Sequence, residues 1–306
     1  MKNAGWKWVV GVIALGACCL AARAQEGAGD VVYVPTPEVV VDAMLKMAKV
    51  GPNDFLIDLG SGDGRIIITA AKKYGARGFG VDLDTVLLKR ANENAKREGV
   101  TDRAHFVEQN LFETDLSKAT VITSYLLPEM NEKLRPKVLR LKPGTRVVAH
   151  DYHMGEWRAD DNDTLSVPEK IVGNPGVSYI YLWIVPGNAA GRWQASVPVA
   201  GRTLALDVTF DQRYQMLSGG AKVNGEPAHI EGARLKGEEV TFSLITGKGA
   251  SAVRHEFNGR VQGDTITGTV RMHAGKKVDQ AQFTAKRTAA GKLDLGASLP
   301  VPADVL

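Results

Sequence analysis

Runs of β-branched and aromatic residues alternate with longer helical segments over residues 31–186. This alternation is typical of parallel strands joined by crossover helices, because a tight turn cannot link parallel neighbours. The first helix follows Thr36 and Pro37, which suit an N-cap and a first-turn position. Its spacing predicts one buried stripe, made of Val40, Val41, Met44, Leu45 and Ala48. We therefore expect an α/β domain over residues 31–186, with a doubly wound, mostly parallel sheet.

The pattern changes after residues 186–191, whose Pro, Gly, Asn and Ala content is typical of a linker. Beyond them, short alternating runs separated by glycine-bearing turns predict a small antiparallel β sandwich or barrel over residues 191–287. Gly191-Arg192-Trp193 is similar to the opening of lipocalin-like barrels. A structural module, a protein-binding module and a container for an apolar ligand all stay open. Residues 288–306 are rich in Ala, Gly and Pro, and predict a flexible tail.

The first 24 residues have the layout of a secretory signal peptide. Lys2 and Lys7 precede an apolar run that is too short for a comfortable membrane span, and small residues close it at Ala22 and Ala24. Cleavage after Ala24 predicts a periplasmic or secreted protein with no stable membrane span. A loose lipobox ending at Cys18 leaves a lipoprotein anchor as an alternative, and the uncleaved leader could itself act as an anchor.

Composition narrows the classes of function. The hydrophobic fraction of 44% and charged fraction of 24% are ordinary for a globular chain. The net charge is +4, but three of those charges lie in the leader, so we expect no nucleic-acid partner. Both cysteines, Cys18 and Cys19, also lie in the leader, which excludes a disulfide framework, a zinc–cysteine site and a cysteine nucleophile.

A glycine-rich loop, Asp-Leu-Gly-Ser-Gly-Asp-Gly at residues 58–64, follows a predicted strand and opens a helix. A nicotinamide-binding loop has the spacing G-x-G-x-x-G, whereas this loop reads G-x-G-x-G. Asp58 and Asp63 place negative charge where a diphosphate would sit. Two unit charges about 4 Å apart interact by roughly 4 kcal/mol at an effective dielectric constant of 20. The loop therefore disfavours a diphosphate and favours a cation.

S-adenosylmethionine matches this loop, because it carries an ammonium and a sulfonium and no phosphate. Asp82 ends the next predicted strand, where its carboxylate can accept hydrogen bonds from both ribose hydroxyls. Asn110 follows the third strand and can bind an adenine edge. An ordinary tight turn remains the alternative for the glycines, and a capping role the alternative for Asn110. The sequence therefore predicts S-adenosylmethionine as the cofactor.

Over residues 31–185 the chain resembles the class I, seven-strand S-adenosylmethionine-dependent methyltransferases, which have a Rossmann-like fold. Residues 32–37 and 58–65 narrow the resemblance to the family of the mitochondrial ATP synthase c-subunit lysine methyltransferase and its bacterial relatives. The cofactor-binding residues that the resemblance implies are Tyr33, Thr36, Asp58, Gly60, Gly62, Gly64 and Asp82. It implies that Tyr33 and Thr36 lie over the cofactor and that Asp82 holds its ribose. Asp58 and the three glycines would hold its methionine end. The leader and the β domain depart from the family.

Residues after the fourth and fifth strands face the transferable methyl group in such a sheet. Tyr125 is our first candidate, as an aromatic wall or a hydrogen-bond partner of the acceptor, although a tyrosine also suits a strand end. His150 or Asp151 could serve as the base, with a plain loop role as the alternative. Neighbouring strand residues point to opposite faces, so no metal site is predicted over residues 150–153. Residues 124–128 also lack the tetrad of nucleobase amino-methyltransferases.

The leading hypothesis is therefore an enzyme that methylates a protein side chain, lysine, in the cell envelope. The alternative is an exported, non-catalytic module that binds adenosine or S-adenosylmethionine and uses its β domain to contact a partner. S-adenosylmethionine is made in the cytosol, so an exported enzyme needs a supply that the sequence does not explain. The sequence leaves the oligomeric state open.

Overall fold

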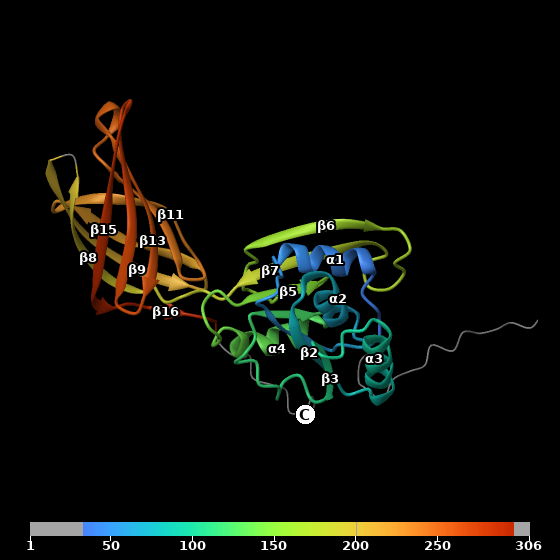
Figure 1. Ribbon diagram of the computed structural model, residues 1–306. Helices are drawn as coiled ribbons and strands as arrows, with labels where there is room; N and C mark the ends of the chain where they lie inside the picture. The colour runs from blue at the N-terminus through green and yellow to red at the C-terminus, as the bar shows by residue number, and fades with distance from the viewer. Residues whose placement is uncertain (1–32, 200, 297–306) are drawn as a thin grey trace, which may run out of the picture.

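The computed structural model describes residues 33–199 and 201–296, which form two domains (Figure 1). The predicted signal peptide lies outside these residues. In the part of the chain that the structure describes, no helix has the length and apolar character needed to cross a membrane.

The first domain is built on a seven-stranded sheet with the order β3-β2-β1-β4-β5-β7-β6. The first five strands in this order are parallel, and β7 and β6 extend the sheet in antiparallel fashion. The strands are β1 (Phe55–Leu59), β2 (Arg77–Asp82), β3 (Ala104–Glu108), β4 (Val121–Ser124), β5 (Arg146–His150), β6 (Asp161–Val167) and β7 (Gly176–Ile184). The doubly wound, mostly parallel sheet is confirmed.

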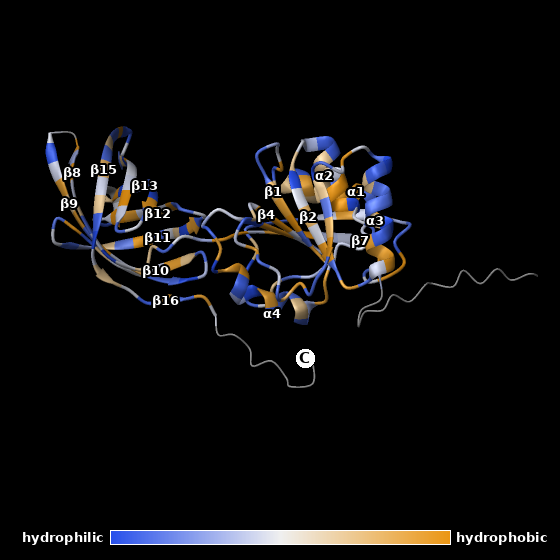
Figure 2. Ribbon diagram, turned by 60° about the horizontal axis from the view of Figure 1, so that its bottom comes forward, coloured by the Kyte–Doolittle hydropathy of each residue, from blue (hydrophilic) through white to orange (hydrophobic). Residues whose placement is uncertain are grey.

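Helices cover both faces of this sheet, because its central strands are apolar on both sides (Figure 2). The helices are α1 (Glu38–Met47), α2 (Arg65–Tyr74), α3 (Thr85–Arg97) and α4 (Pro128–Val138). Leu56, Val121 and Val148 pack on the side of α1, α2 and α3. Their strand neighbours Ile57, Ile122 and Val147 pack on the side of α4. The predicted stripe of α1 is buried as expected.

Thr36 does not cap α1, which corrects the sequence-based prediction. The residue before the helix is Pro37, at φ −56° and ψ 144°, and no side chain caps the helix. Proline also biases the residue before it away from helical geometry. The Thr36 hydroxyl is buried instead and lies 3.3 Å from Nδ1 of His150.

The second domain is a closed barrel of eight antiparallel strands. The sequence predicts either a sandwich or a barrel, and the structure shows the barrel. Each strand pairs with the next in the chain, and β15 pairs with β8 to close the barrel. The strands are β8 (Gly191–Val199), β9 (Arg202–Arg213), β10 (Met216–Val223), β11 (Glu226–Lys236), β12 (Glu239–Thr246), β13 (Val253–Gln262), β14 (Thr265–Ala274) and β15 (Lys277–Ala290). Stacked and edge-to-face contacts join four rings of its core, from Phe210, Phe242, Phe257 and Phe283.

The prediction of a flexible tail over residues 288–306 is wrong for residues 288–294. Strand β15 continues to Ala290, and a short strand β16 (Leu293–Asp294) pairs in parallel with β9. Backbone hydrogen bonds order this segment: the N–H of Gln212 donates to the carbonyl of Lys292 and that of Tyr214 to Asp294. Composition missed it because such bonds need no apolar side chains. Residues 297–306 lie outside the described part of the chain.

The junction between the domains is packed. Ala189 and Ala190 are buried, and the N–H of Gly187 donates to the carbonyl of Gly237 at 2.7 Å. The predicted linker is therefore an ordered segment in contact with the barrel.

Candidate active site

The glycine loop crosses from β1 to α2 at the carboxyl edge of the sheet, as the sequence predicts. Gly60, Gly62 and Gly64 have φ values of +77°, +52° and +81°. Only glycine adopts such angles at little cost, so the spacing of the three glycines is set by the turn itself. The N–H groups of Gly60 and Ser61 both donate to the carbonyl of Val81 at 2.9 Å, which ties the loop to β2.

Tyr33 lies directly on this loop. A Cβ atom at Gly62 would lie 2.4 Å from the Tyr33 ring, so only glycine allows the ring to pack there. The Tyr33 hydroxyl is buried and has no hydrogen-bond partner among the described residues. Burial, with the nearby charge of Asp63, raises the pKa of Tyr33 to about 12. The phenol therefore keeps its proton near neutral pH.

Asp82 ends β2 and braces the loop from the other side. Its Oδ2 accepts the N–H of Gly62 at 2.8 Å, and its Oδ1 accepts the N–H of Asp84 at 3.0 Å. Each carboxylate oxygen can accept a second hydrogen bond. Asp82 can thus hold the loop and still accept from ribose hydroxyls.

Asp58 is the most buried carboxyl of the loop. Thr123, on the neighbouring strand β4, donates its hydroxyl to Asp58 Oδ1 at 2.6 Å. Burial, opposed by the Thr123 hydrogen bond and aided by the charges of Asp82 and Asp63, raises the pKa of Asp58 to about 7. A cation at this point would favour the ionised form of the carboxyl.

The second acid of the loop, Asp63, does not have the free charge that the sequence predicts. Asp63 forms a two-point ion pair with Arg65, with distances of 2.9 Å from Nε and 2.7 Å from NH2. Burial acts to raise the pKa of Asp63, but the hydrogen bonds and charge of Arg65 outweigh it and hold the pKa below its usual value. Because Asp63 is already neutralised, the charge that would repel a diphosphate comes from Asp58 and Asp82.

Asn110 lies beyond the end of β3. Its Oδ1 accepts the N–H of Phe112 at 2.9 Å, which closes a turn. This is the capping geometry that the sequence left as the alternative. The amide nitrogen of Asn110 remains the group that could meet an adenine edge.

The loop region fits a small polar ligand such as S-adenosylmethionine. Besides the Tyr33 hydroxyl, Ser61 Oγ on the loop and Ser124 Oγ at the end of β4 are buried without a partner among the described residues. An unpaired buried polar group costs about 1–3 kcal/mol. A ligand with several donors and acceptors would satisfy these groups, while its ammonium would be compensated by Asp58.

The three predicted catalytic residues come together beside this region, at the ends of β4 and β5. The Tyr125 hydroxyl donates to Asp151 Oδ2 at 3.0 Å, and the Tyr125 ring lies 3.9 Å from the His150 ring, centre to centre. Burial, followed by the charge of Asp151, raises the pKa of Tyr125 above its ordinary value. Tyr125 is half-buried, so it can face an acceptor.

His150 is fully buried, and both of its ring nitrogens are engaged. Nδ1 faces Thr36 Oγ1, and Nε2 lies 2.9 Å from Ser178 Oγ. Burial, aided by the charge of Lys170 and opposed by that of Asp151, lowers the pKa of His150 to about 4. The imidazole is therefore neutral near pH 7 and has no free nitrogen. This geometry favours a bracing role over the predicted role as a base.

Asp151 is braced in the same way. It has φ +63°, which is uncommon outside glycine, and its Oδ1 accepts the N–H of Tyr179 at 3.2 Å. Its Oδ2 accepts from Tyr125 and from Lys170 Nζ. In the described residues no group of three or more metal-ligating side chains is present, and Nδ1 of His153 accepts the N–H of Gly155.

Lys170 and Ser178 were missed by sequence reasoning. Both lie near the turn from β6 to β7, and strand β6 itself was not predicted, because its residues are mostly polar and exposed. A lysine in a polar segment carries no signal of burial. Only the pairing of β7 with β5 brings these two residues to the edge of the sheet.

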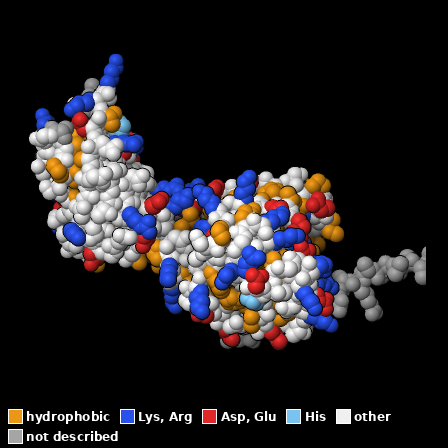
Figure 3. Space-filling view, in the orientation of Figure 1, with side chains coloured by type: hydrophobic (Ala, Val, Ile, Leu, Met, Phe, Trp, Pro, Cys, Tyr) orange, Lys and Arg blue, Asp and Glu red, His pale blue; other side chains and the backbone are white. Residues whose placement is uncertain are grey.

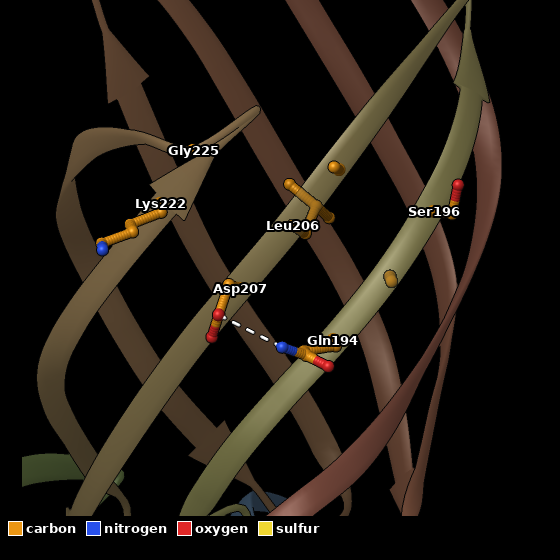
Figure 4. Close-up of a pocket in the computed structure, with 8 residues that line it drawn as sticks. Gln194, Ser196, Leu206, Asp207, Lys222 and Gly225 are labelled. Atoms are coloured by element: carbon orange, nitrogen blue, oxygen red, sulfur yellow. Dashed lines mark hydrogen bonds between the residues drawn. The ribbon is translucent and has the colours of Figure 1, made fainter.

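A groove on the second domain differs from the glycine-loop region in its polar groups. It lies on the barrel over β8, β9 and β10 (Figure 4). Gln194 donates to Asp207 there at 3.2 Å, and Asp207 also pairs with Arg192. Gln194 and Asp207 are thus already paired with protein groups, unlike the unpartnered hydroxyls at the glycine loop.

Comparison with known proteins places the first domain among methyltransferases. A family model described as the ANTKMT methyltransferase domain matches residues 58–161. A protein-lysine N-methyltransferase of Saccharolobus islandicus is 50% identical over 127 residues, which cover 41% of this chain and 79% of that protein. The ATP synthase c-subunit lysine N-methyltransferase of Xenopus laevis is 30% identical over 178 residues, covering 58% and 73%.

Among solved structures, an RNA methyltransferase of Salinibacter ruber in complex with S-adenosyl-L-homocysteine is 48% identical. The match covers 51% of this chain and 95% of that one, with a TM-score of 0.46. The two relatives found by sequence are both named as lysine N-methyltransferases.

Proposed function

Because the chain belongs to the ANTKMT-type family of class I S-adenosylmethionine-dependent methyltransferases, we propose that it methylates the side-chain amine of a protein lysine. It is an enzyme whose cofactor is S-adenosylmethionine. The lysine acceptor is supported by the names of two similar proteins, one from an archaeon and one from a vertebrate.

A second line of support is the surface around the site. Several exposed large apolar side chains of the first domain follow the carboxyl ends of its strands: Leu83, Val86, Leu127, Ile171 and Val172. Apolar residues gathered on one edge suit a protein segment better than a polyanion. On the face that Figure 3 presents, basic and acidic side chains are interspersed. These features favour a protein over RNA as the acceptor.

The chemistry asks little of the protein beyond alignment. The cofactor supplies a methyl group on a sulfonium, which is already a good leaving group. The acceptor nitrogen must be neutral, and its lone pair must point along the line of displacement. Tyr33 and the glycine loop would hold the cofactor, with Asp58 at its ammonium and Asp82 at its ribose. Tyr125, half-buried at the end of β4, would contact the acceptor.

The observation that carries the proposal is the meeting of two groups of residues at one edge. Asp58 lies on β1 and Ser124 on the adjacent strand β4, where Ser124 pairs with Leu59. Tyr125, the proposed acceptor contact, follows Ser124 in the chain. The cofactor and an acceptor can therefore be held side by side.

Methyl transfer from radiolabelled cofactor to cell extracts tests the acceptor. We expect label in protein that is removed by protease, resists ribonuclease and yields methyl-lysine on hydrolysis. Label that ribonuclease removes would contradict the lysine assignment. No incorporation in spite of tight cofactor binding would favour the non-catalytic binding module instead.

We also propose that the enzyme acts in the cell envelope, on the strength of the leader sequence. Residues 1–32 fused to a reporter that is active only outside the cytosol test this. Reporter activity is expected, and should be lost when Lys2 and Lys7 become glutamate. A reporter that stays inactive would contradict export.

A further inference from the structure

Lys170 is buried in the first domain, on the segment that joins β6 and β7. Only 4% of its side chain is exposed, and it pairs with Asp151, whose side chain is fully buried. Its Nζ also donates to the carbonyl of Val177 at 2.7 Å. Lysine is almost never buried unless it is paired, and loss of one partner of a buried pair leaves a costly isolated charge. The fold therefore keeps this lysine in one place.

The same segment closes over the Tyr125–Asp151 pair. Gly173 has φ +77°, and a Cβ atom there would lie 3.0 Å from the Tyr125 hydroxyl and 3.1 Å from Asp151 Oδ2. Lys170 and Tyr125 both donate to this Oδ2. Lys170, Asp151 and Tyr125 thus form a continuous chain from the segment to the residue that faces the acceptor.

The charge state of Asp151 decides which way the Tyr125 hydroxyl points. An ionised carboxylate can only accept, so it takes the phenolic hydrogen and leaves the lone pairs of the phenol oxygen free. A protonated Asp151 could instead donate to that oxygen and occupy it. The ammonium of Lys170 stabilises the ionised form, as an opposite charge in contact does.

Resting on the proposed transfer to an amine, we propose that Lys170 is a positioning residue that keeps the Tyr125 oxygen free to accept an N–H of the acceptor. The amine lone pair then points away from Tyr125 and toward the methyl group. That lone pair forms the new N–C bond while the S–C bonding pair returns to sulfur. The resulting ammonium releases its proton to solvent.

The test compares K170M, which removes the charge and keeps much of the length, with K170R, which keeps the charge. K73M is the matched control, because Lys73 pairs with Asp42 on the surface. We expect K170M to lower kcat/KM for the acceptor at least tenfold and to change cofactor affinity less than twofold. K170R should recover part of the loss, and K73M should match the parent. In a D151N background, K170M should have no further effect.

Acceptor kinetics within twofold of the parent, or an equal loss in the D151N background, would overturn the proposal.

Failure of the proposed function can be told apart from failure of this inference. If the parent methylates no acceptor, the function fails, and carbon-13 NMR of labelled aspartate carboxyls still tests Lys170. With the Asp151 signal assigned from D151N, we expect the Asp151 carboxyl shift in K170M to differ from that of the parent, in the direction of the protonated acid. An identical Asp151 shift in the two proteins would overturn the role of Lys170 even in an active enzyme.

A second variant covers the case in which K170M does not fold. Gly173→Ala removes no charge but places a methyl group against the Tyr125 hydroxyl and Asp151. Its acceptor kcat/KM should fall at least fivefold with cofactor affinity retained. Unchanged acceptor kinetics would contradict the proposal.

Discussion

At the residue scale, we propose that recognition of the charge of the cofactor depends on Asp58. It is buried on β1, it accepts one hydrogen bond from Thr123, and its pKa lies at about 7 in the free protein. A carboxyl with this pKa is partly protonated at neutral pH. The ammonium of the cofactor stabilises the charged form only, so binding should draw the proton off.

We therefore predict that cofactor affinity depends on pH below neutrality. Because binding favours the ionised form and protons compete with it, affinity should fall as the pH drops from 7 to 6, by up to about tenfold per pH unit. Calorimetry with S-adenosylhomocysteine in buffers of different ionisation enthalpy measures both the affinity and the released proton. Asp58→Asn should bind weakly and without this dependence. An affinity that stays constant over that range in the parent would contradict the role of Asp58.

At the scale of the elements, the loop between β1 and α2 owes its shape to the close packing of a side chain on its backbone. Tyr33 comes from the segment before α1, and its ring occupies the space above Gly62. A change at either residue should therefore alter the shape of the loop. We therefore propose that the shape of this loop sets where the cofactor can lie.

Gly62→Ala should weaken cofactor binding at least tenfold. The new methyl group would meet the Tyr33 ring at 2.4 Å, at a φ of +52° that alanine disfavours. Gly51→Ala is the matched control, since Gly51 has no atom within 4 Å of such a methyl group and lacks a positive φ. Binding constants from calorimetry compare the two. Equal affinities in both variants would show that the loop does not need glycine at this position.

Sequence alone predicts elements whose apolar residues recur at a clear period. The buried face of α1 and the glycine loop follow from local spacing, and both are found where predicted. Strand β6 and residues 288–294 were missed because pairing with β7, β8 and β9 orders them, without a run of buried side chains. Lys170 was missed for a related reason: its partner Asp151 is 19 residues away, and only the folded sheet joins them.

In the molecule as a whole, the barrel is anchored on the first domain. Tyr214, from the turn between β9 and β10, packs within the core on the α4 side of the sheet. Trp157 is fully buried and donates to Gln215 Oε1 at 3.1 Å, and Gln215 donates to the carbonyl of Arg158 at 2.6 Å. The barrel thereby holds the segment that leads from Asp151 toward β6.

The two domains should unfold together. Gln215→Ala leaves the buried indole N–H of Trp157 without its partner, which costs about 1–3 kcal/mol, so it should lower the melting temperature of one common transition. Gln194→Ala is the control, because Gln194 is an exposed barrel residue. Scanning calorimetry gives the outcome. Two well-separated transitions in the parent would show that the barrel is an independent attachment.

Titration of the full chain with S-adenosylhomocysteine, with NAD as a competitor, is the sharpest test of the ligand that the glycine loop selects. We predict one binding site per chain, no competition by NAD, and a loss of about 1.5–3 kcal/mol in Asp82→Ala, the usual range for hydrogen bonds to a charged group. No binding by the parent chain, displacement by NAD, or unchanged affinity in Asp82→Ala would contradict the assignment of this loop as the cofactor site.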